Sequence, residues 1–133
     1  MYPPETRFLV VDDAATMRML VGKVLRQLGY TNIVECENGA VAWKLLEEGN
    51  PATDFVISDW NMPDATGLTL LKNVRSSDRH KDLPFLMVTS EASNEQVVEA
   101  IRAGVDNYII KPFTGDSLKA KIDSIYKKRN GIK

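Results

Sequence analysis

The sequence predicts an α/β fold, a doubly wound parallel sheet of five strands with helices on both faces. Two observations support this prediction. Five short apolar runs, each too brief for a helix, alternate along the chain with five longer segments whose apolar residues recur at helical spacing. Strict alternation of strand and helix implies right-handed crossover connections, which place successive strands parallel in one sheet with helices on both sides.

The predicted strands are rich in apolar and β-branched residues and are bounded by polar residues or turn formers. They are expected at residues 8–11, 32–36, 55–58, 83–88 and 107–110, and the second is the weakest of the five.

The predicted helices are amphipathic and several have recognisable ends. They are expected at residues 16–28, 39–48, 67–76, 93–103 and 115–128. Gly29 and Gly104 follow two of them, as is typical of helix C-termini, and Ser93 with Gln96 has the spacing of a capping box. The residues expected to face the sheet are Leu20, Val21, Val24, Leu25, Leu28, Val41, Ala42, Leu45, Leu46, Leu68, Leu71, Val74, Val97, Ala100, Ile101, Leu118, Ile122, Ile125 and Tyr126.

Length and composition indicate one soluble domain spanning residues 1–133, with residues 1–6 and 129–133 expected to fray. No apolar run approaches the roughly 18 residues of a membrane helix, and the N-terminus lacks the features of a signal peptide. The single cysteine, Cys36, excludes an internal disulfide and fits the reducing cytoplasm. A net charge of −1 argues against nonspecific nucleic-acid binding. We therefore expect a cytoplasmic protein that binds neither membrane nor nucleic acid.

Polar side chains follow four of the predicted strands directly. Asp12 and Asp13 follow the first, Asp59 the third, Thr89 the fourth and Lys111 the fifth. In open α/β sheets, ligands bind beyond the carboxyl ends of the strands, where these residues would all gather. The sequence pattern alone does not fix the order of the strands.

These residue types together predict magnesium-dependent phosphoryl chemistry. Three neighbouring carboxylates repel one another and need a cation, and an all-oxygen ligand set suits Mg²⁺ or Mn²⁺ rather than Zn²⁺. Asp59 is the predicted nucleophile on phosphorus, because carboxylates form aspartyl-phosphates, and Asp12 with Asp13 is the predicted metal pair. Lys111 would neutralise phosphoryl charge and Thr89 would donate a hydrogen bond. Any one of these residues alone has an ordinary explanation as a turn former, helix cap or surface lysine.

Five motifs resemble the receiver domain of two-component response regulators, and the likeness spans residues 7–128. The motifs are FLVVDD at 8–13, TMR at 16–18, SDWNMP at 58–63, LMVT at 86–89 and KPFT at 111–114. The chain is most similar to the single-domain chemotaxis members of that family. The resemblance implies a flavodoxin-like fold with strand order 2-1-3-4-5.

The resemblance also implies roles for the residues at the predicted site. Asp59 would accept a phosphoryl group from the phosphohistidine of a sensor kinase of the chemotaxis type. Asp13, Asp59 and the backbone carbonyl of Asn61 would bind Mg²⁺, and Asp12 would reach the ion through water. Lys111 would pair with the phosphoryl group.

Further residues would transmit and time the signal. Thr89 would move toward the phosphoryl group, and Tyr108 would turn inward behind it. Asn61 and Glu91 occupy the positions that tune the lifetime of the phosphate in the family, and the peptide bond before Pro112 is cis in relatives.

The resemblance implies a monomeric switch, not a turnover enzyme, with its reader surface at residues 93–104, 107–110 and 115–128. The expected reader is a flagellar motor switch protein, and a phosphatase is a further possible partner. Thr66, Ala14 and Ser90 differ from the residues common in the family. Because none of them replaces a reacting group, we expect changes in rate rather than loss of chemistry.

Three alternatives stay open at the level of sequence. A receiver domain can instead be a phosphorelay intermediate that passes phosphate to a histidine phosphotransfer protein. A magnesium-dependent phosphatase of the haloacid dehalogenase type also uses an Asp nucleophile after a strand, but it needs a second Asp where this chain has Asn61. A flavodoxin-type flavin protein is the third, and three acidic groups would be a poor cradle for a flavin phosphate.

Overall fold

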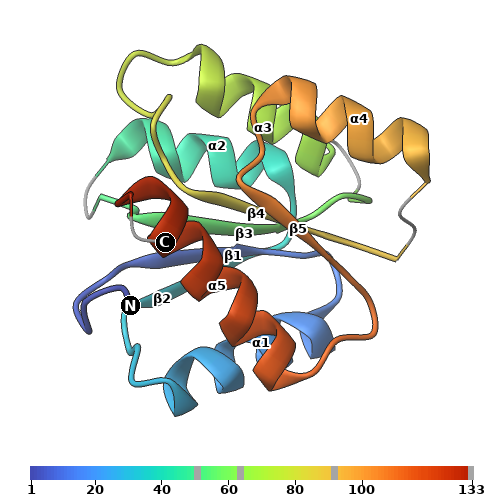
Figure 1. Ribbon diagram of the computed structural model, residues 1–133. Helices are drawn as coiled ribbons and strands as arrows, with labels where there is room; N and C mark the ends of the chain where they lie inside the picture. Colours follow the sequence, from blue (N-terminus) through green and yellow to red (C-terminus); the bar gives the residue numbers. More distant parts are fainter. Residues whose placement is uncertain (50–51, 63–64, 91–92, 132–133) are drawn as a thin grey trace.

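The computed structural model of the chain describes residues 1–49, 52–62, 65–90 and 93–131. Within these ranges, five strands alternate with five α-helices (Figure 1). The elements are β1 (Phe8–Val11), α1 (Ala15–Gln27), β2 (Ile33–Cys36), α2 (Gly39–Glu48), β3 (Phe55–Asp59), α3 (Gly67–Ser76), β4 (Phe85–Thr89), α4 (Asn94–Ala103), β5 (Asn107–Ile110) and α5 (Gly115–Arg129). All neighbouring strands are parallel, in the order β2-β1-β3-β4-β5, so the predicted fold class and strand order are confirmed.

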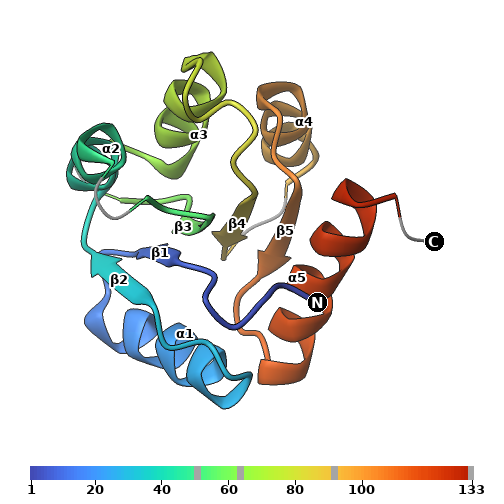
Figure 2. The same ribbon diagram turned by 90° about the vertical axis from the view of Figure 1, so that its left-hand side faces the viewer.

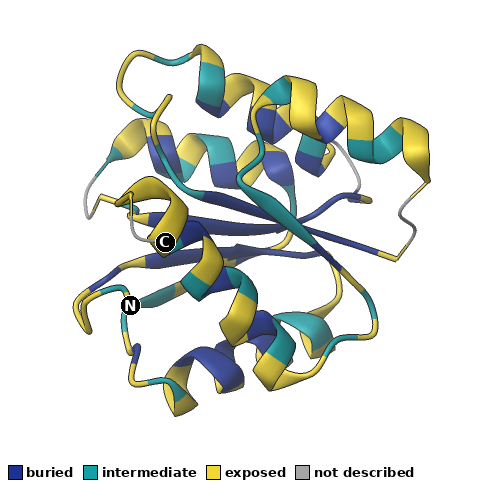
Figure 3. Ribbon diagram, in the orientation of Figure 1, coloured by how far each residue is buried: buried dark blue, intermediate teal, exposed yellow. Residues whose placement is uncertain are grey.

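The sheet separates two layers of helices, with α1 and α5 on one face and α2, α3 and α4 on the other (Figures 1 and 2). Side chains alternate between these faces along each strand. Phe8 and Val10 of β1 belong to the core beneath α1 and α5, whereas Leu9 and Val11 belong to the core beneath α2–α4. Buried residues therefore run the length of the central strands, while the outer helix faces are exposed (Figure 3).

The predicted helix ends are largely confirmed by local hydrogen bonds. The Ser93 side chain accepts a hydrogen bond from the Gln96 N–H at 3.2 Å and so caps α4. Gly49 and Gly104 end α2 and α4 with φ angles of 63° and 94°, a left-handed conformation that glycine adopts at little cost. None of the helices in the described ranges is both long and apolar enough to cross a membrane.

Three residues predicted to face the sheet are exposed instead. Leu20, Val41 and Ile101 are 42%, 40% and 61% exposed. Each lies next to a buried residue and is therefore turned about 100° away from it around the helix axis. Leu70 of α3, which was not predicted, is fully buried. In these helices, the face that contacts the sheet is therefore narrower than the apolar pattern in the sequence, or is rotated relative to it around the helix axis.

Two strands extend one residue further than predicted, and two start later, including β2, which begins at Ile33 rather than Asn32. Asp59 and Thr89 are the last residues of β3 and β4, because Asp59 lies in register with Val88 and Thr89 with Ile110. The fourth strand begins at Phe85 rather than Leu83. Proline lacks the N–H that a ladder needs, so Pro84 cannot continue the pairing toward Leu83.

The segment of residues 1–6, which was expected to fray, contacts the core through Tyr2. The Tyr2 ring packs edge-on against Phe55 and Tyr126, with ring centroids 5.3 and 4.9 Å apart. Its backbone carbonyl accepts a hydrogen bond from the Tyr30 hydroxyl at 2.9 Å. Aromatic contacts therefore anchor the N-terminus to β3 and α5.

Arg129, the first residue of the C-terminal segment expected to fray, is the last residue of α5. Its Nε donates to Asp106 Oδ1 at 2.7 Å and its Nη2 to Asp106 Oδ2 at 2.9 Å. A two-point charged contact holds the end of the helix against the segment before β5. Residues 132–133 lie outside the described ranges.

Candidate functional site

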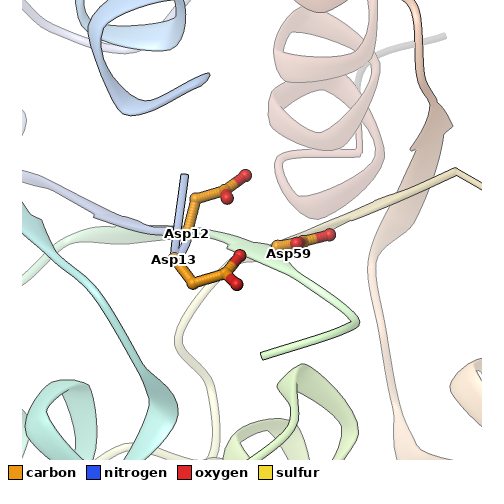
Figure 4. Close-up of side chains that lie close together, drawn as sticks. All are labelled: Asp12, Asp13 and Asp59. Atoms are coloured by element: carbon orange, nitrogen blue, oxygen red, sulfur yellow. The ribbon is translucent and has the colours of Figure 1, made fainter. Parts of the chain in front are cut away.

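Three carboxylates gather at the carboxyl ends of β1 and β3 (Figure 4). Because Val11 is in register with Ser58, the next residues along each strand, Asp12 and Asp59, lie side by side. One carboxylate oxygen from each of Asp12, Asp13 and Asp59 lies within 4.8 Å of the others. Asp12 and Asp59 are buried, whereas Asp13 is exposed, so the cluster opens to solvent on one side.

Lys111 reaches the carboxylates from the segment after β5. Its Nζ lies 3.2 Å from Asp12 Oδ2 and 3.4 Å from Asp59 Oδ1. The Lys111 backbone N–H donates to the Thr89 carbonyl at 2.7 Å, which keeps the chain beside β4. The following peptide bond, before Pro112, is cis, as the family resemblance implied. The structure thus brings the acids and the amine together as the sequence predicted.

Burial and charge both act on Asp59. Burial raises the pKa of its carboxyl group, the neighbouring Asp12 raises it further, and Lys111 and the Trp60 N–H oppose the rise. The Trp60 N–H donates to Asp59 Oδ1 at 2.9 Å. The free energy lost when the carboxylate is removed from water is therefore larger than the free energy gained from one ammonium and one amide. A further cation would stabilise the ionised site.

Asp12 is held by contacts that the sequence reasoning did not identify. Its Oδ1 accepts from the Ala14 N–H at 2.9 Å, and its backbone carbonyl accepts from Arg18 Nη1 at 2.5 Å. Arg18 Nε also lies 3.6 Å from Glu35 Oε1, which links α1 to β2. The signals in the sequence were the TMR motif at 16–18 and the position of Arg18 one turn into the helix that follows the acidic pair.

Gly67 allows the first turn of α3 to approach Asp59 closely. A Cβ atom at this position would lie 2.2 Å from the Asp59 carbonyl oxygen, so only glycine fits. The Gly67 N–H donates to the Trp60 carbonyl at 2.9 Å. Thr66, where relatives commonly have another residue, caps α3 by accepting from the Thr69 N–H. Its hydroxyl therefore has a local structural role.

Thr89 and Tyr108 lie together near the acids, on β4 and β5. Thr89 is 4% exposed, and Tyr108 is half-buried. Both line a cavity of about 10 Å³ that also touches α4. On its other side, the Tyr108 ring lies 5.5 Å from Lys121 Nζ of α5. The two residues are thus placed where movement of one can affect the other.

Of the two positions predicted to tune the lifetime of the phosphate, the structure describes one. Asn61 is exposed two residues beyond Asp59, and its carbonyl as a metal ligand stays a prediction. Glu91 lies outside the described residues, as does Pro63, the last residue of the SDWNMP motif.

The ligand set of the cluster fits a hard divalent ion. All three clustered side chains are carboxylates, and the one exposed member leaves an open approach from solvent. Oxygen ligands of this kind suit Mg²⁺, which keeps several waters and binds together with phosphate. Asp12, Asp13, Asp59 and the Asn61 carbonyl are the groups that would hold it.

Comparisons of the chain with protein families, with curated sequences and with solved structures agree with one another. The family described as response regulator receiver domain matches residues 8–123. The chain is 48% identical to the chemotaxis protein CheY of Pseudomonas aeruginosa, over 94% of this chain and 99% of that relative. It is 45% identical to the chemotaxis protein CheY1 of Helicobacter pylori, over 90% and 95%. The solved structure of CheY4 of Vibrio cholerae superposes with a TM-score of 0.83 at 30% identity, over 91% of this chain and 98% of that one.

Proposed function

The chain belongs to the response regulator receiver domain family, and we propose that it is a chemotaxis switch that is phosphorylated on Asp59. The observation that carries the proposal is the convergence of three carboxylates within 4.8 Å with the Lys111 ammonium 3.4 Å from Asp59. The donor would be a phosphohistidine on a sensor histidine kinase of the CheA type, in the cytoplasm.

In the proposed reaction, Asp59 Oδ2 attacks the phosphorus atom, because Oδ1 already accepts the Trp60 N–H. The bond from phosphorus to the histidine nitrogen breaks, and that nitrogen keeps the electron pair and takes up a proton. Bound Mg²⁺ would neutralise charge on the phosphoryl oxygens. Lys111 would turn from the carboxylates to the phosphoryl group, which a lysine can do because its stem is long and flexible.

The phosphoryl group would shift the protein between two states. It adds about −1.5 to −2 charges and strong acceptor oxygens. Moving a ratio of inactive to active molecules from about 99:1 to 1:99 needs about 5.5 kcal/mol. One charge-assisted hydrogen bond supplies only about 1.5–3 kcal/mol. Both Thr89 and Lys111 are therefore needed, and phosphorylation without a bound reader should activate incompletely.

The reader would bind the surface formed by α4, β5 and α5. Val98, Ile101 and Ile110 on this surface are 44%, 61% and 46% exposed. Relatives at 44–48% identity bear the name chemotaxis protein, so the proposed reader is a flagellar motor switch protein. We propose that the protein acts as a monomer, that a phosphatase can shorten its signal, and that it does not turn over external substrates.

The test is phosphorylation in vitro with Mg²⁺ and acetyl phosphate, followed by intact mass. One phosphoryl group should be added to the wild type and none to Asp59→Asn or to wild type in EDTA. Beryllofluoride with Mg²⁺ should change the fluorescence of Trp60, read in a Trp43→Phe background because the chain has two tryptophans. A mass increase that survives Asp59→Asn would contradict the proposal.

Separate assays distinguish the alternatives. Binding of the beryllofluoride form to a motor switch fragment supports the chemotaxis switch. Transfer of phosphate onward to a histidine phosphotransfer domain, without motor binding, would favour the relay. Sustained hydrolysis of free phosphate esters that Asp59→Asn abolishes would favour the phosphatase.

A further inference from the structure

The side chain of Gln96, in the first turn of α4, has a buried acceptor that lacks a partner. Its Oε1 is buried and receives no hydrogen bond from the described residues. The backbone N–H of the same residue donates to Ser93 Oγ at 3.2 Å, so the unpaired atom is the side-chain oxygen. Buried polar atoms are nearly always hydrogen-bonded, because leaving one unpaired costs its full desolvation. This exception therefore calls for an explanation.

Gln96 lines the same cavity as Thr89 and Tyr108. The cavity holds about 10 Å³ and is also bordered by Trp60 and Ala100. That volume is about the minimum for a single water molecule, so a hydroxyl group fits and an aromatic ring does not. The unpaired acceptor thus borders a space of the size of one donor group.

Tyr108 and Thr89 both carry a hydroxyl on this cavity, and the proposed function commits the Thr89 hydroxyl to the phosphoryl group. A phenol hydroxyl donates one hydrogen bond, and Tyr108 is only half-buried. Lys121 Nζ of α5 lies 5.5 Å from the centroid of the Tyr108 ring, an attractive contact that favours the present position of the ring. Tyr108 therefore lies between a cation on α5 and an unpaired acceptor on α4.

We propose that Gln96 Oε1 accepts a hydrogen bond from the Tyr108 hydroxyl in the activated state and so ties β5 to α4. When Thr89 moves toward the phosphoryl group on Asp59, the hydroxyl enters the cavity. The inference rests on the proposed phosphorylation of Asp59. Gln96 is a positioning residue here, because it acts on Tyr108 and not on the reacting atoms. The unpaired acceptor disfavours the resting state and the new bond relieves that cost, so Gln96 biases the switch toward activation.

A double-mutant cycle tests this bond. Wild type, Gln96→Met, Tyr108→Phe and the double variant are titrated with beryllofluoride at fixed Mg²⁺ in the Trp43→Phe background, and the midpoint is read from Trp60 fluorescence. Gln96→Met keeps the side-chain length and removes the acceptor. Each single variant should weaken the apparent affinity roughly 2- to 12-fold, the range of one neutral hydrogen bond. The double variant should be no weaker than either single variant.

Glu95→Gln is the matched control, because Glu95 is exposed on the same turn of α4 and should leave the midpoint unchanged. Thermal unfolding in EDTA is the second readout, and Gln96→Met should be at least as stable as wild type because it removes an unpaired polar atom. The proposal is overturned if Gln96→Met leaves the midpoint unchanged, or weakens it equally in the Tyr108→Phe background. Wild type that gives neither a phosphoryl adduct nor a fluorescence response would overturn the proposed function and this bond together.

Discussion

Replacing Asp59 by Asn should stabilise the metal-free protein while removing most of its response to Mg²⁺. The substitution keeps the shape of the side chain and an oxygen for the Trp60 N–H, but it removes one charge from the acidic cluster. Because burial is the largest cause of the raised pKa of Asp59, the ionised form is a net cost to the folded state at neutral pH.

The size of the effect follows from the distances. At an effective dielectric constant of about 20, the attraction to Lys111 at 3.4 Å is worth about 5 kcal/mol. The repulsion from Asp12, and from Asp13 before screening by solvent, is at least about 3.5 kcal/mol each, because the carboxylate oxygens lie within 4.8 Å of one another. The repulsion therefore offsets the attraction to Lys111, and desolvation adds to the cost of the ionised form. We expect a gain on the order of 1–2 kcal/mol, or about 4–7 °C in Tm for a chain of 133 residues.

Magnesium should reverse the order of stability of wild type and Asp59→Asn. Mg²⁺ at about 100 times its Kd stabilises the folded wild type by about 2.7 kcal/mol, which is about 10 °C. Asp59→Asn lacks one ligand and should gain far less. The assay is thermal unfolding followed by circular dichroism, in EDTA and in a Mg²⁺ series.

Lys111→Met is the matched control, and its effect on stability in EDTA should have the opposite sign. Without the ammonium, the carboxylates lose their partner in a mostly buried site, so stability in EDTA should fall by about 3 kcal/mol. The gain from Mg²⁺ should grow, because the ion no longer competes with Lys111. The reasoning is refuted if Asp59→Asn lowers Tm in EDTA, or if Lys111→Met raises it.

The pH dependence gives an independent check of the same cause. A group whose pKa is raised by folding contributes favourably below its unfolded pKa, and that contribution is lost as pH rises through the folded pKa. For Asp59 the ordinary value is 3.8. The advantage of Asp59→Asn in EDTA should therefore vanish at pH values below about 3.8 and grow as pH rises above it.

Three further predictions concern contacts around the site and at the chain ends. Asp106→Asn should cost about 3–5 kcal/mol in urea unfolding, because the partly buried Arg75 and Arg129 both lose their carboxylate partner, whereas Arg129→Met should cost about 1.5–3 kcal/mol; equal losses would contradict this order. Tyr2→Phe should not destabilise, since the buried Tyr2 hydroxyl has no hydrogen-bond partner among the described residues, whereas Tyr2→Ala should cost about 2 kcal/mol. Burial raises the pKa of Tyr2 to about 12, so wild type, unlike Tyr2→Phe, should lose stability as pH rises through that value. Arg18→Met should weaken Mg²⁺ binding about 10-fold with little change in Tm, by loosening the backbone of the acidic pair; unchanged Mg²⁺ affinity would exclude this positioning role.

The sequence predicted that Asp12, Asp13, Asp59 and Lys111 would converge, because a parallel sheet turns local patterns into spatial ones. Each of these side chains follows an apolar run, and all parallel strands end at one edge, so separate local signals converge without knowledge of the contacts. Asp12 and Asp59 even occupy matching register positions, one residue beyond the pair Val11 and Ser58. The strand order was not readable from this pattern and came only from the family resemblance.

The errors arose where a residue's position depends on a distant partner. Leu20, Val41 and Ile101 have the spacing of core residues, but which arc of a helix meets the sheet depends on how neighbouring helices pack. Tyr2 lies in a segment whose composition predicts fraying, and its order depends on the rings of Phe55 and Tyr126. Local propensity contains none of this information.

The position of Lys111 shows how far geometry restricts the choice of residue at the site. Lys111 follows β5, and β4 lies between β5 and the strand that ends in Asp59. Parallel strands are about 4.8 Å apart, so the ammonium must cross about two strand spacings to lie 3.4 Å from Asp59 Oδ1. A long, flexible side chain with a compact charge meets that requirement. Each of the two carboxylates presents a single oxygen to Lys111 Nζ. The planar, forked guanidinium group of an arginine suits two oxygens of one carboxylate and does not match this arrangement. We therefore expect Lys111→Arg, although it keeps the charge, to impair phosphorylation of Asp59 nearly as much as Lys111→Met; normal phosphorylation of the arginine variant would show that charge alone is sufficient.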